Sequence, residues 1–176
     1  MKTFSKRFWR DLGGVSAIEF ALVLPVMLAT FFGISEVANY VLAARKAANA
    51  ASTAADLVAQ DTQITNDEMN DIMLSLNAVL MPFDPATAQI RITEVDADDD
   101  GDTTVGWSDA RHTSPRNPGS PVTVPDGIVP DGQGVIMAEI TFTYQTLFGM
   151  YMNDGMTMSD KFYLKPRRST KVLRTH

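Results

Sequence analysis

An apolar run near the N-terminus constrains this 176-residue chain more than any other feature. No charged residue occurs from Phe20 to Ile34. With its apolar flanks the run is long enough to cross a bilayer core of about 30 Å, which takes about 20 helical residues. One carboxylate, Glu19, lies at the start of the run, five residues after Gly14. A charge is unfavourable in lipid, so either Glu19 has a functional reason or the segment is not membranous.

The charge of the chain is unevenly distributed. The first 14 residues contain four basic residues and one acidic residue, whereas the whole chain has a net charge of −6. A basic segment before an apolar run stays on the cytoplasmic side of a membrane. The acidic remainder argues against nucleic-acid binding. The chain has no cysteine, which excludes disulfides and thiolate metal sites.

Three interpretations of the N-terminus compete. A cleaved secretory signal has the basic and apolar regions, but Glu19 falls inside its apolar part and no small-residue cleavage site follows promptly. A plain membrane anchor explains the length and orientation of the segment but neither Glu19 nor Gly14. A prepilin-type leader, cut after Gly14, is the third interpretation.

The helical pattern continues beyond the membrane segment. Residues 41–60 are rich in strong helix formers and contain no Gly or Pro. Spacings of three and four residues predict one small-residue stripe, formed by Val41, Ala44, Ala48, Ala51, Ala55 and Val58. This stripe packs either on the sheet of its own chain or against sister helices in an assembly.

The rest of the chain predicts one more helix and then strands. A capping box at Thr65 and Glu68 starts the second helix, and Pro82 ends it. Alternating or apolar runs predict strands at 89–95, 103–108, 135–145 and 158–165, with an irregular, proline-rich excursion at 109–134. We therefore expect an α+β fold. A long N-terminal transmembrane helix of roughly 45 residues, about 70 Å, continues into a head with a short second helix and an antiparallel sheet of about four strands.

An acidic loop follows the first predicted strand. Asp96, Asp98, Asp100 and Gly101 fit the first half of an EF-hand loop, but the twelfth position is Trp107 instead of a bidentate Glu. The preceding segment is also strand-like. Two interpretations stay open: a solvated acidic turn, or a calcium site outside the EF-hand class with the ligands Asp96, Asp98, Asp100 and Asp102.

Catalytic motifs are not recognised. His112 and His176 have no partner at metal-ligand spacing, and no Walker, Gly-x-Ser-x-Gly or dinucleotide motif occurs. Asp109, Arg111 and His112 form a polar group in a predicted loop without a nucleophile. An enzyme is disfavoured. Aromatic and methionine residues between the last two strands either cover the core or form a partner surface: Phe148, Met150, Tyr151, Met152, Met156 and Met158.

The N-terminal block resembles the TadE-like family of the tight-adherence (Tad) pilus machinery, whose members are membrane-anchored and pseudopilin-like. The matching residues are Gly14, Val15–Pro25 and Gly33–Glu36. Looser similarity extends downstream over Ile90–Thr93, Val105–Ser108, Val135–Tyr144 and Phe162–Arg167.

The resemblance implies a role for four residues. Gly14 would be the last leader residue, and Val15 the new N-terminus after a prepilin peptidase cuts on the cytoplasmic face. Glu19 would then be the fifth residue of the mature chain and face the terminal amine of a neighbouring subunit, acting as a registry device. Phe20 replaces the tyrosine common in major Flp-type pilins, which fits TadE-like chains better. The C-terminal domain is also far too large for a Flp-type pilin.

The expected layout is a leader over 1–14, a transmembrane helix over 15–44, its extracytoplasmic continuation over 45–60 and an α+β head domain over 61–176. We expect a single-pass protein of the bacterial inner membrane, with its N-terminus in the cytoplasm and its C-terminal domain in the periplasm or, within a pilus, at the cell surface.

The predicted function is non-enzymatic: a minor pseudopilin or assembly subunit of a Tad (Flp) type IV pilus or related secretion machinery. Its predicted partners are other Tad pilin-like subunits, the prepilin peptidase, the Tad inner-membrane platform and the membrane, with no nucleic acid and no cofactor. The first alternative is a membrane-anchored periplasmic binding domain that binds calcium or another surface molecule through the acidic loop over Asp96–Asp102. A von Willebrand-type Tad relative is disfavoured because its Asp-x-Ser-x-Ser motif is missing.

Overall fold

The computed structural model describes residues 14–146 and 155–175. The predicted leader, apart from Gly14, and the aromatic and methionine residues at 148–152 lie outside the described residues. Contacts between Cα atoms divide the chain into a first unit, Met1–Asn39, and a second unit, Tyr40–His176.

Helix α2, Val15–Ala59, contains the whole predicted membrane segment and continues through Pro25. This confirms the long N-terminal apolar helix. Within the first unit its large apolar side chains are exposed: Val15, Ile18, Phe20, Leu22, Val23, Val26, Met27, Leu28, Phe31, Phe32, Ile34 and Val37.

The part of α2 in the second unit buries a face made of alanine. Its buried residues are Ala43, Ala47, Ala50, Ala51, Ala54, Ala55, Val58 and Ala59. The predicted small-residue stripe packs inside the second unit at Ala51, Ala55 and Val58, whereas Val41 is exposed and Ala44 and Ala48 are only half-buried. Alanine is so frequent here that several faces of the helix share the same spacing, and the sequence pattern alone does not select one.

The second helix and its start are as predicted. Helix α3, Asn66–Leu80, begins at a capping box: the Thr65 hydroxyl accepts from the Glu68 amide and the Glu68 carboxylate accepts from the Thr65 amide. These bonds satisfy amides that the first turn leaves unpaired. A 3-10 turn, η2 (Pro85–Thr87), leads into the sheet.

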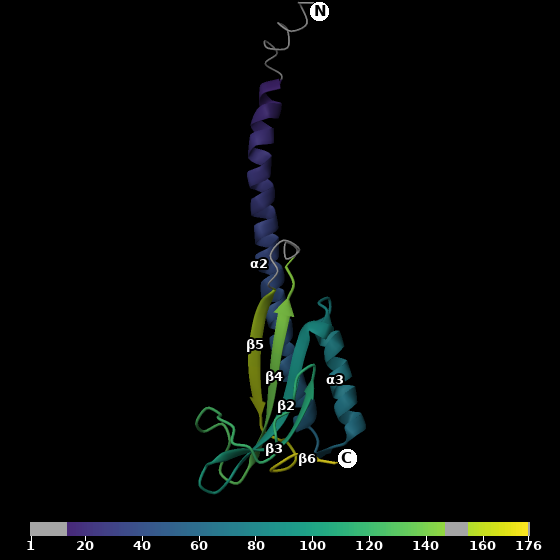
Figure 1. Ribbon diagram of the computed structural model, residues 1–176, viewed down its shortest axis with the longest axis vertical. Coiled ribbons are helices and arrows are strands. Elements are labelled where there is room, and N and C mark those ends of the chain that lie inside the picture. The colour runs from purple at the N-terminus through teal and green to yellow at the C-terminus, as the bar shows by residue number, and fades with distance from the viewer. Residues whose placement is uncertain (1–13, 147–154, 176) are drawn as a thin grey trace, which may run out of the picture. The chain divides into compact units, whose positions relative to one another are not determined.

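The main sheet has four antiparallel strands in the order β3-β2-β4-β5 (Figure 1). Their bounds are Ala88–Ala97 for β2, Thr103–Arg111 for β3, Gly134–Tyr144 for β4 and Met156–Leu164 for β5. The α+β class is confirmed. One local prediction is wrong: Asp109 and Arg111 belong to strand β3, not to a loop, so the irregular excursion starts after them.

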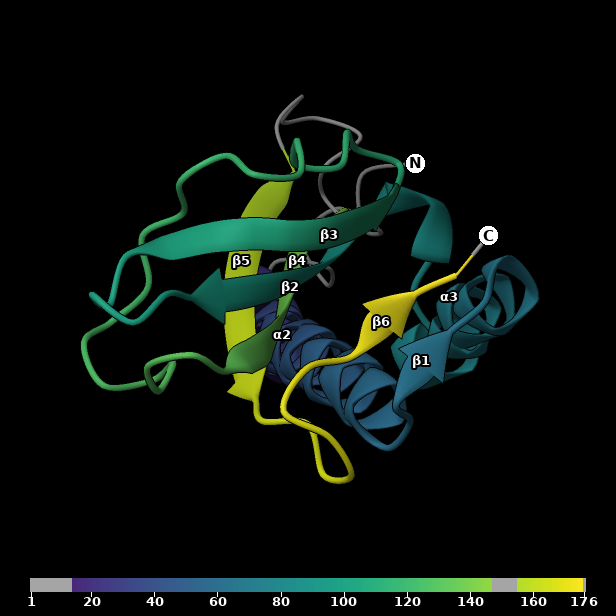
Figure 2. The same cartoon turned by 90° about the horizontal axis from the view of Figure 1, so that it is seen from below.

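A second, two-stranded sheet was not predicted. β1 (Gln63–Ile64) pairs in parallel with β6 (Leu173–Arg174). Two-residue strands leave no alternation to recognise in a sequence. The pair connects the C-terminal segment to the chain between α2 and α3 (Figure 2).

The sheet has a core on each face. The larger core joins the alanine face of α2 and the inner face of α3 to inward side chains of the sheet, including Ile90, Ile92, Ile140 and Phe142. Figure 2 shows α2 and α3 on the same side of the sheet. A smaller core on the other face lies beneath the irregular excursion and contains Val95, Val105, Val122, Val129, Val135 and Met137.

Candidate functional site

The predicted assembly residues lie at the start of α2. Gly14 immediately precedes the helix, Val15 is its first residue, and Glu19 and Phe20 lie in its second turn. All four are exposed. A Cβ atom added to Gly14 would meet nothing within 4 Å, so packing within the described chain gives no reason for a glycine there. Within the same residues Glu19 has no ion-pair partner. Contacts among the described residues therefore explain neither Gly14 nor Glu19.

The exposed part of α2 satisfies its own polar groups. The Thr30 hydroxyl donates to the Val26 carbonyl at 2.9 Å, and the Ser35 hydroxyl donates to the Phe31 carbonyl at 2.9 Å. Hydroxyls bonded within their own helix are compatible with lipid, where water cannot serve as a partner. By length and composition α2 is able to cross a membrane, and such a helix fits a single-pass anchor.

The four predicted calcium ligands are not gathered around one point. Oδ1 of Asp98 accepts from the amides of Asp100 and Asp102 at 3.0 and 2.8 Å, which fixes the hairpin turn. Asp96 instead pairs with Lys171 Nζ at 3.0 Å. Across the ranges that the structure describes, no group of three or more His, Asp or Glu is placed to hold a metal ion. Calcium binding stays a prediction that this arrangement does not favour.

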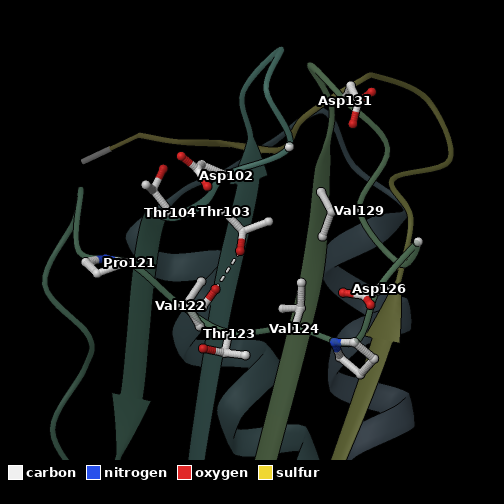
Figure 3. A pocket seen from close by; sticks show the side chains of 13 residues that line it. Asp102, Thr103, Thr104, Pro121, Val122, Thr123, Val124, Asp126, Val129 and Asp131 are labelled. Carbon is white, nitrogen blue, oxygen red and sulfur yellow. Dashed lines mark hydrogen bonds between the residues drawn. The ribbon is translucent and has the colours of Figure 1, made fainter.

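A broad hollow lies beside the acidic turn, between the β2–β3 hairpin and the excursion (Figure 3). Its volume is about 760 Å³. Thr103 Oγ1 donates to the Val122 carbonyl at 2.6 Å at its wall. Valines form the apolar part of the lining, and the carboxylates of Asp102, Asp126 and Asp131 provide negative charge around it. This charge favours a cationic occupant over an anionic one.

A buried carboxylate, Glu94, was missed by the sequence analysis. It lies on the inner face of β2, in the row that begins with Ile90 and Ile92, and is only 3% exposed. Two glycines make room for it: a Cβ atom on Gly106 would lie 2.5 Å from Glu94 Oε2, and one on Gly134 would lie 2.4 Å from Oε1. A side chain at either glycine would displace the carboxyl group.

The surroundings of Glu94 change its proton affinity. Burial, with the nearby Asp96 as a second cause, raises its pKa from 4.5 to about 7. The Val172 amide donates to Oε1 at 3.2 Å, and this bond lowers the pKa of Glu94. The positive charge of Lys171 lowers it as well, but the two effects together are smaller than the rise that burial and Asp96 cause. The signal in the sequence was the position itself. Alternation placed an inward side chain at 94, where an acid needs a partner.

Glu139 shows the opposite behaviour on the outer face of the same sheet. It lies directly between Arg91 and Lys161 in the strand register. Its carboxylate pairs with Arg91 at 3.3 Å, Arg116 at 2.7 Å and Lys161 at 3.0 Å. Burial alone would raise its pKa, but the bonds from Lys161 and Arg116 outweigh burial and lower the pKa below 4.5.

The basic C-terminal segment is fixed to the second unit. Arg167 pairs with Asp56, Lys171 with Asp96, and Arg174 with Asp109. The Trp107 indole donates to the Val172 carbonyl at 2.7 Å. The segment therefore closes the end of the core around Glu94. His112, from the predicted polar group, contacts the Ala88 carbonyl through Nδ1 at 2.8 Å.

Residues 14–56 match the family model described as TadE-like protein. The match begins at Gly14 and includes Val15, Glu19, Phe20 and most of α2. The sheet, the acidic turn and the C-terminal segment lie outside it. Comparisons with curated proteins and with solved structures give no match.

Proposed function

From the TadE-like segment at residues 14–56, which connects the chain with Tad pilus assembly, we propose that the protein is a minor pseudopilin or assembly subunit of a Tad-type pilus or related secretion machinery. Its activity is binding, not catalysis. The observation that carries the proposal is that the family match and the exposed apolar part of α2 overlap in sequence. The family match covers the part of α2 whose large apolar side chains are exposed, and these side chains require lipid or sister helices.

The first step in this role is processing. We propose that a prepilin peptidase cuts between Gly14 and Val15 on the cytoplasmic face. Two observations support this site: a basic segment precedes it, and packing among residues 14–146 and 155–175 gives no reason for a glycine at 14. Cleavage leaves Val15 with a free amine, four residues before Glu19. The released chain is anchored by the span over 15–44, with the continuation and the head in the periplasm.

Glu19 then sets the register between subunits. A carboxylate in lipid is stabilised by a nearby ammonium group, and only a correctly placed neighbour brings its Val15 amine within reach. The exposure of Glu19 and its lack of an ion-pair partner among the described residues support this role. The same side chain would have no purpose in a plain anchor. Partners in the assembly are other Tad pilin-like subunits and the inner-membrane platform.

The test separates assembly from insertion. Two separate variants of the full chain are made. Glu19→Ala removes the proposed registry carboxylate, and Asp71→Ala is a control that removes an exposed carboxylate from α3. We expect the Glu19 variant to insert and to lose its leader like the parent chain, but to fail in co-purification with other Tad subunits and in pilus formation. The control should assemble normally. Normal assembly of the Glu19 variant would show that the registry role is wrong.

A further inference from the structure

A second hollow, smaller than the one in Figure 3, lies where the C-terminal segment closes the core. Its volume is about 450 Å³, and we call it the Glu94 hollow. Three acidic residues line it, Glu94, Asp96 and Asp109, together with the basic residues Lys171 and Arg174. Asp96 pairs with Lys171 at 3.0 Å, and Asp109 pairs with Arg174 at 2.8 Å. Glu94 has no ion pair among the described residues, so the lining has one acidic group more than it has counter-ions.

Two neighbouring carboxylates of this lining each have one occupied oxygen and one oxygen without a hydrogen bond. Oε1 of Glu94 accepts from the Val172 amide, and Oδ1 of Asp96 contacts Lys171 Nζ. Within the part of the chain that the structure describes, no group donates to Glu94 Oε2 or Asp96 Oδ2. Both oxygens approach Gly106: a Cβ atom there would lie 2.5 Å from Glu94 Oε2 and 2.9 Å from Asp96 Oδ2. The two oxygens are therefore close enough together for one nitrogen to bond both.

Burial makes the unbonded oxygen of Glu94 significant. The residue is only 3% exposed, and a buried carboxylate oxygen without a hydrogen-bond donor is unfavourable. Its pKa of about 7 means that a positive charge placed beside it at neutral pH stabilises the ionised form. The unbonded oxygen and the missing counter-ion thus indicate the same kind of ligand, a cation with at least two N–H donors.

The arrangement of the free oxygens selects the class of cation. A guanidinium fork matches both oxygens of one carboxylate, but neither Glu94 nor Asp96 has both oxygens free. An ammonium group has three donors that point in different directions. Across the described ranges no three His, Asp or Glu are grouped to hold a metal ion. Trp107, whose indole N–H is bonded to the Val172 carbonyl, and Pro118 add apolar surface to the lining.

We propose that the Glu94 hollow binds a primary alkylammonium group. The nitrogen donates to Glu94 Oε2 and Asp96 Oδ2, and the carbon chain lies against Trp107 and Pro118. A free alkylamine and a lysine side chain that protrudes from another protein share this chemistry, and the test distinguishes these two sources. The site belongs to the second unit alone and does not depend on the proposed function.

The test uses the full chain in mild detergent with Trp9→Phe, which leaves Trp107 as the single tryptophan. Its fluorescence and the heat of binding are followed during titration with n-pentylammonium at pH 6 and pH 8, with n-pentanol as the uncharged control. A second titration uses the blocked peptide Gly-Gly-Lys-Gly-Gly and its norleucine counterpart. Glu94→Gln removes the charge but keeps the shape of the side chain. Asp126→Asn is the matched control, because it removes an exposed carboxylate that lines only the hollow in Figure 3.

We expect n-pentylammonium to bind about tenfold more tightly at pH 8 than at pH 6, because the proton on Glu94 competes with the ligand below its pKa of about 7. The other charged groups of the lining are aspartate, lysine and arginine side chains, which ordinarily titrate outside this range. At pH 8 Glu94→Gln should weaken binding about tenfold or more, whereas Asp126→Asn should leave it unchanged. Glu94→Gln removes a buried charge, so we expect this variant to keep its fold at pH 8.

Four results would overturn the proposal: no saturable binding of either ammonium probe, equal binding at both pH values, binding of n-pentanol as tight as that of the ammonium, or equal binding by the parent chain and Glu94→Gln. Binding of the lysine peptide but not of its norleucine counterpart would identify a protein side chain as a ligand that the hollow admits. Binding of n-pentylammonium alone would identify the ligand as a free amine.

Discussion

The two parts of helix α2 share one helical backbone but differ in which side chains they expose and which they bury. Residues 15–42 present large apolar side chains such as Phe31 to the outside, whereas residues 43–59 bury a face of alanine against the sheet. Large exposed side chains require an apolar environment that the described part of the chain does not provide. Small buried side chains let the helix approach the sheet closely, because alanine adds little bulk at the contact.

The difference shows where each part finds its stability. The buried part belongs to the second unit and depends on packing inside it. In the proposed function, the exposed part is instead stabilised by lipid and by other subunits. The TadE-like match over residues 14–56 covers all of the exposed part from Val15 and most of the buried part. A substitution in one part should therefore leave the property governed by the other part unchanged.

The largest effect is expected from placing the same charge in each part of α2. Ala54→Asp buries an unpaired carboxylate at a fully buried position, and we expect the second unit to lose about 3–5 kcal/mol of its free energy of unfolding. Denaturant titration in mild detergent, followed through the buried Trp107, measures this loss.

Ala29→Asp is the matched change in the exposed part. It should leave the denaturant titration unchanged and weaken membrane insertion by about 2.5–3.5 kcal/mol, which a carbonate-extraction assay detects. Equal destabilisation of the second unit by both variants would contradict the division of α2.

Glu94 extends the comparison from apolar side chains to carboxylates. Its pKa rises from 4.5 in the unfolded chain to about 7 in the folded one, so the folded state binds the proton more tightly. Its contribution to the free energy of unfolding is fully present below pH 4.5 and is lost as the pH rises through 7. The loss amounts to about 3 kcal/mol.

Glu94→Gln keeps an acceptor for the Val172 amide and cannot ionise. At pH 8 we expect this variant to be more stable than the parent chain by about 3 kcal/mol, and at pH 4 to be nearly equal to it. The measurement is a denaturant titration at both pH values. Equal stability at pH 8 would mean that Glu94 is not held in an environment that disfavours its charge.

Glu139, on the outer face of the sheet, has a pKa shift opposite in sign to that of Glu94. Because its folded pKa lies below 4.5, its contribution is present above pH 4.5 and is lost as the pH falls through the folded value. Glu139→Gln should therefore destabilise the second unit at pH 7 by about 1.5–3 kcal/mol, with a smaller difference at low pH. Thermal unfolding at a series of pH values tests this, and a pH-independent difference would contradict the ionic origin.

The smallest expected effect concerns the start of a helix. α3 begins at the Thr65–Glu68 capping box, so Thr65→Ala should destabilise the second unit by about 1 kcal/mol. Ser16→Ala at the exposed start of α2 is the comparison and should change nothing in the same unfolding titration. A loss of similar size in both variants would remove the distinction between the two helix starts.

The elements predicted from the sequence are those with strong local signals. Thr65 and Glu68 marked the start of α3, Pro82 marked its end, and alternation located β2 and β4 within a few residues. The α+β fold class followed from the change after Pro85, where the spacing of apolar residues switches from a helical period to the alternation of strands. These signals are local because capping and alternation depend on neighbours in the chain.

The remaining features depend on residues far apart in sequence. Which alanines of α2 face the sheet is decided by packing, since many alanines fit the same spacing. The β1–β6 pair joins segments more than a hundred residues apart. The environment of Glu94 is formed by Gly106, Gly134 and Val172, which lie in three separate segments. No one of these segments contains a pattern that predicts a buried carboxylate. The partner of Glu19, in our account, lies in another chain altogether.

The central claim, that the chain is processed as a pseudopilin at the start of α2, is tested most directly by the N-terminus of the mature protein. The full chain is co-expressed with its prepilin peptidase, purified from membranes and examined by mass spectrometry and N-terminal sequencing. We predict a chain that lacks Met1–Gly14 and begins Val15-Ser16-Ala17, with Gly14→Leu blocking the cut. A chain that keeps Met1–Gly14 in the presence of active peptidase would contradict the account.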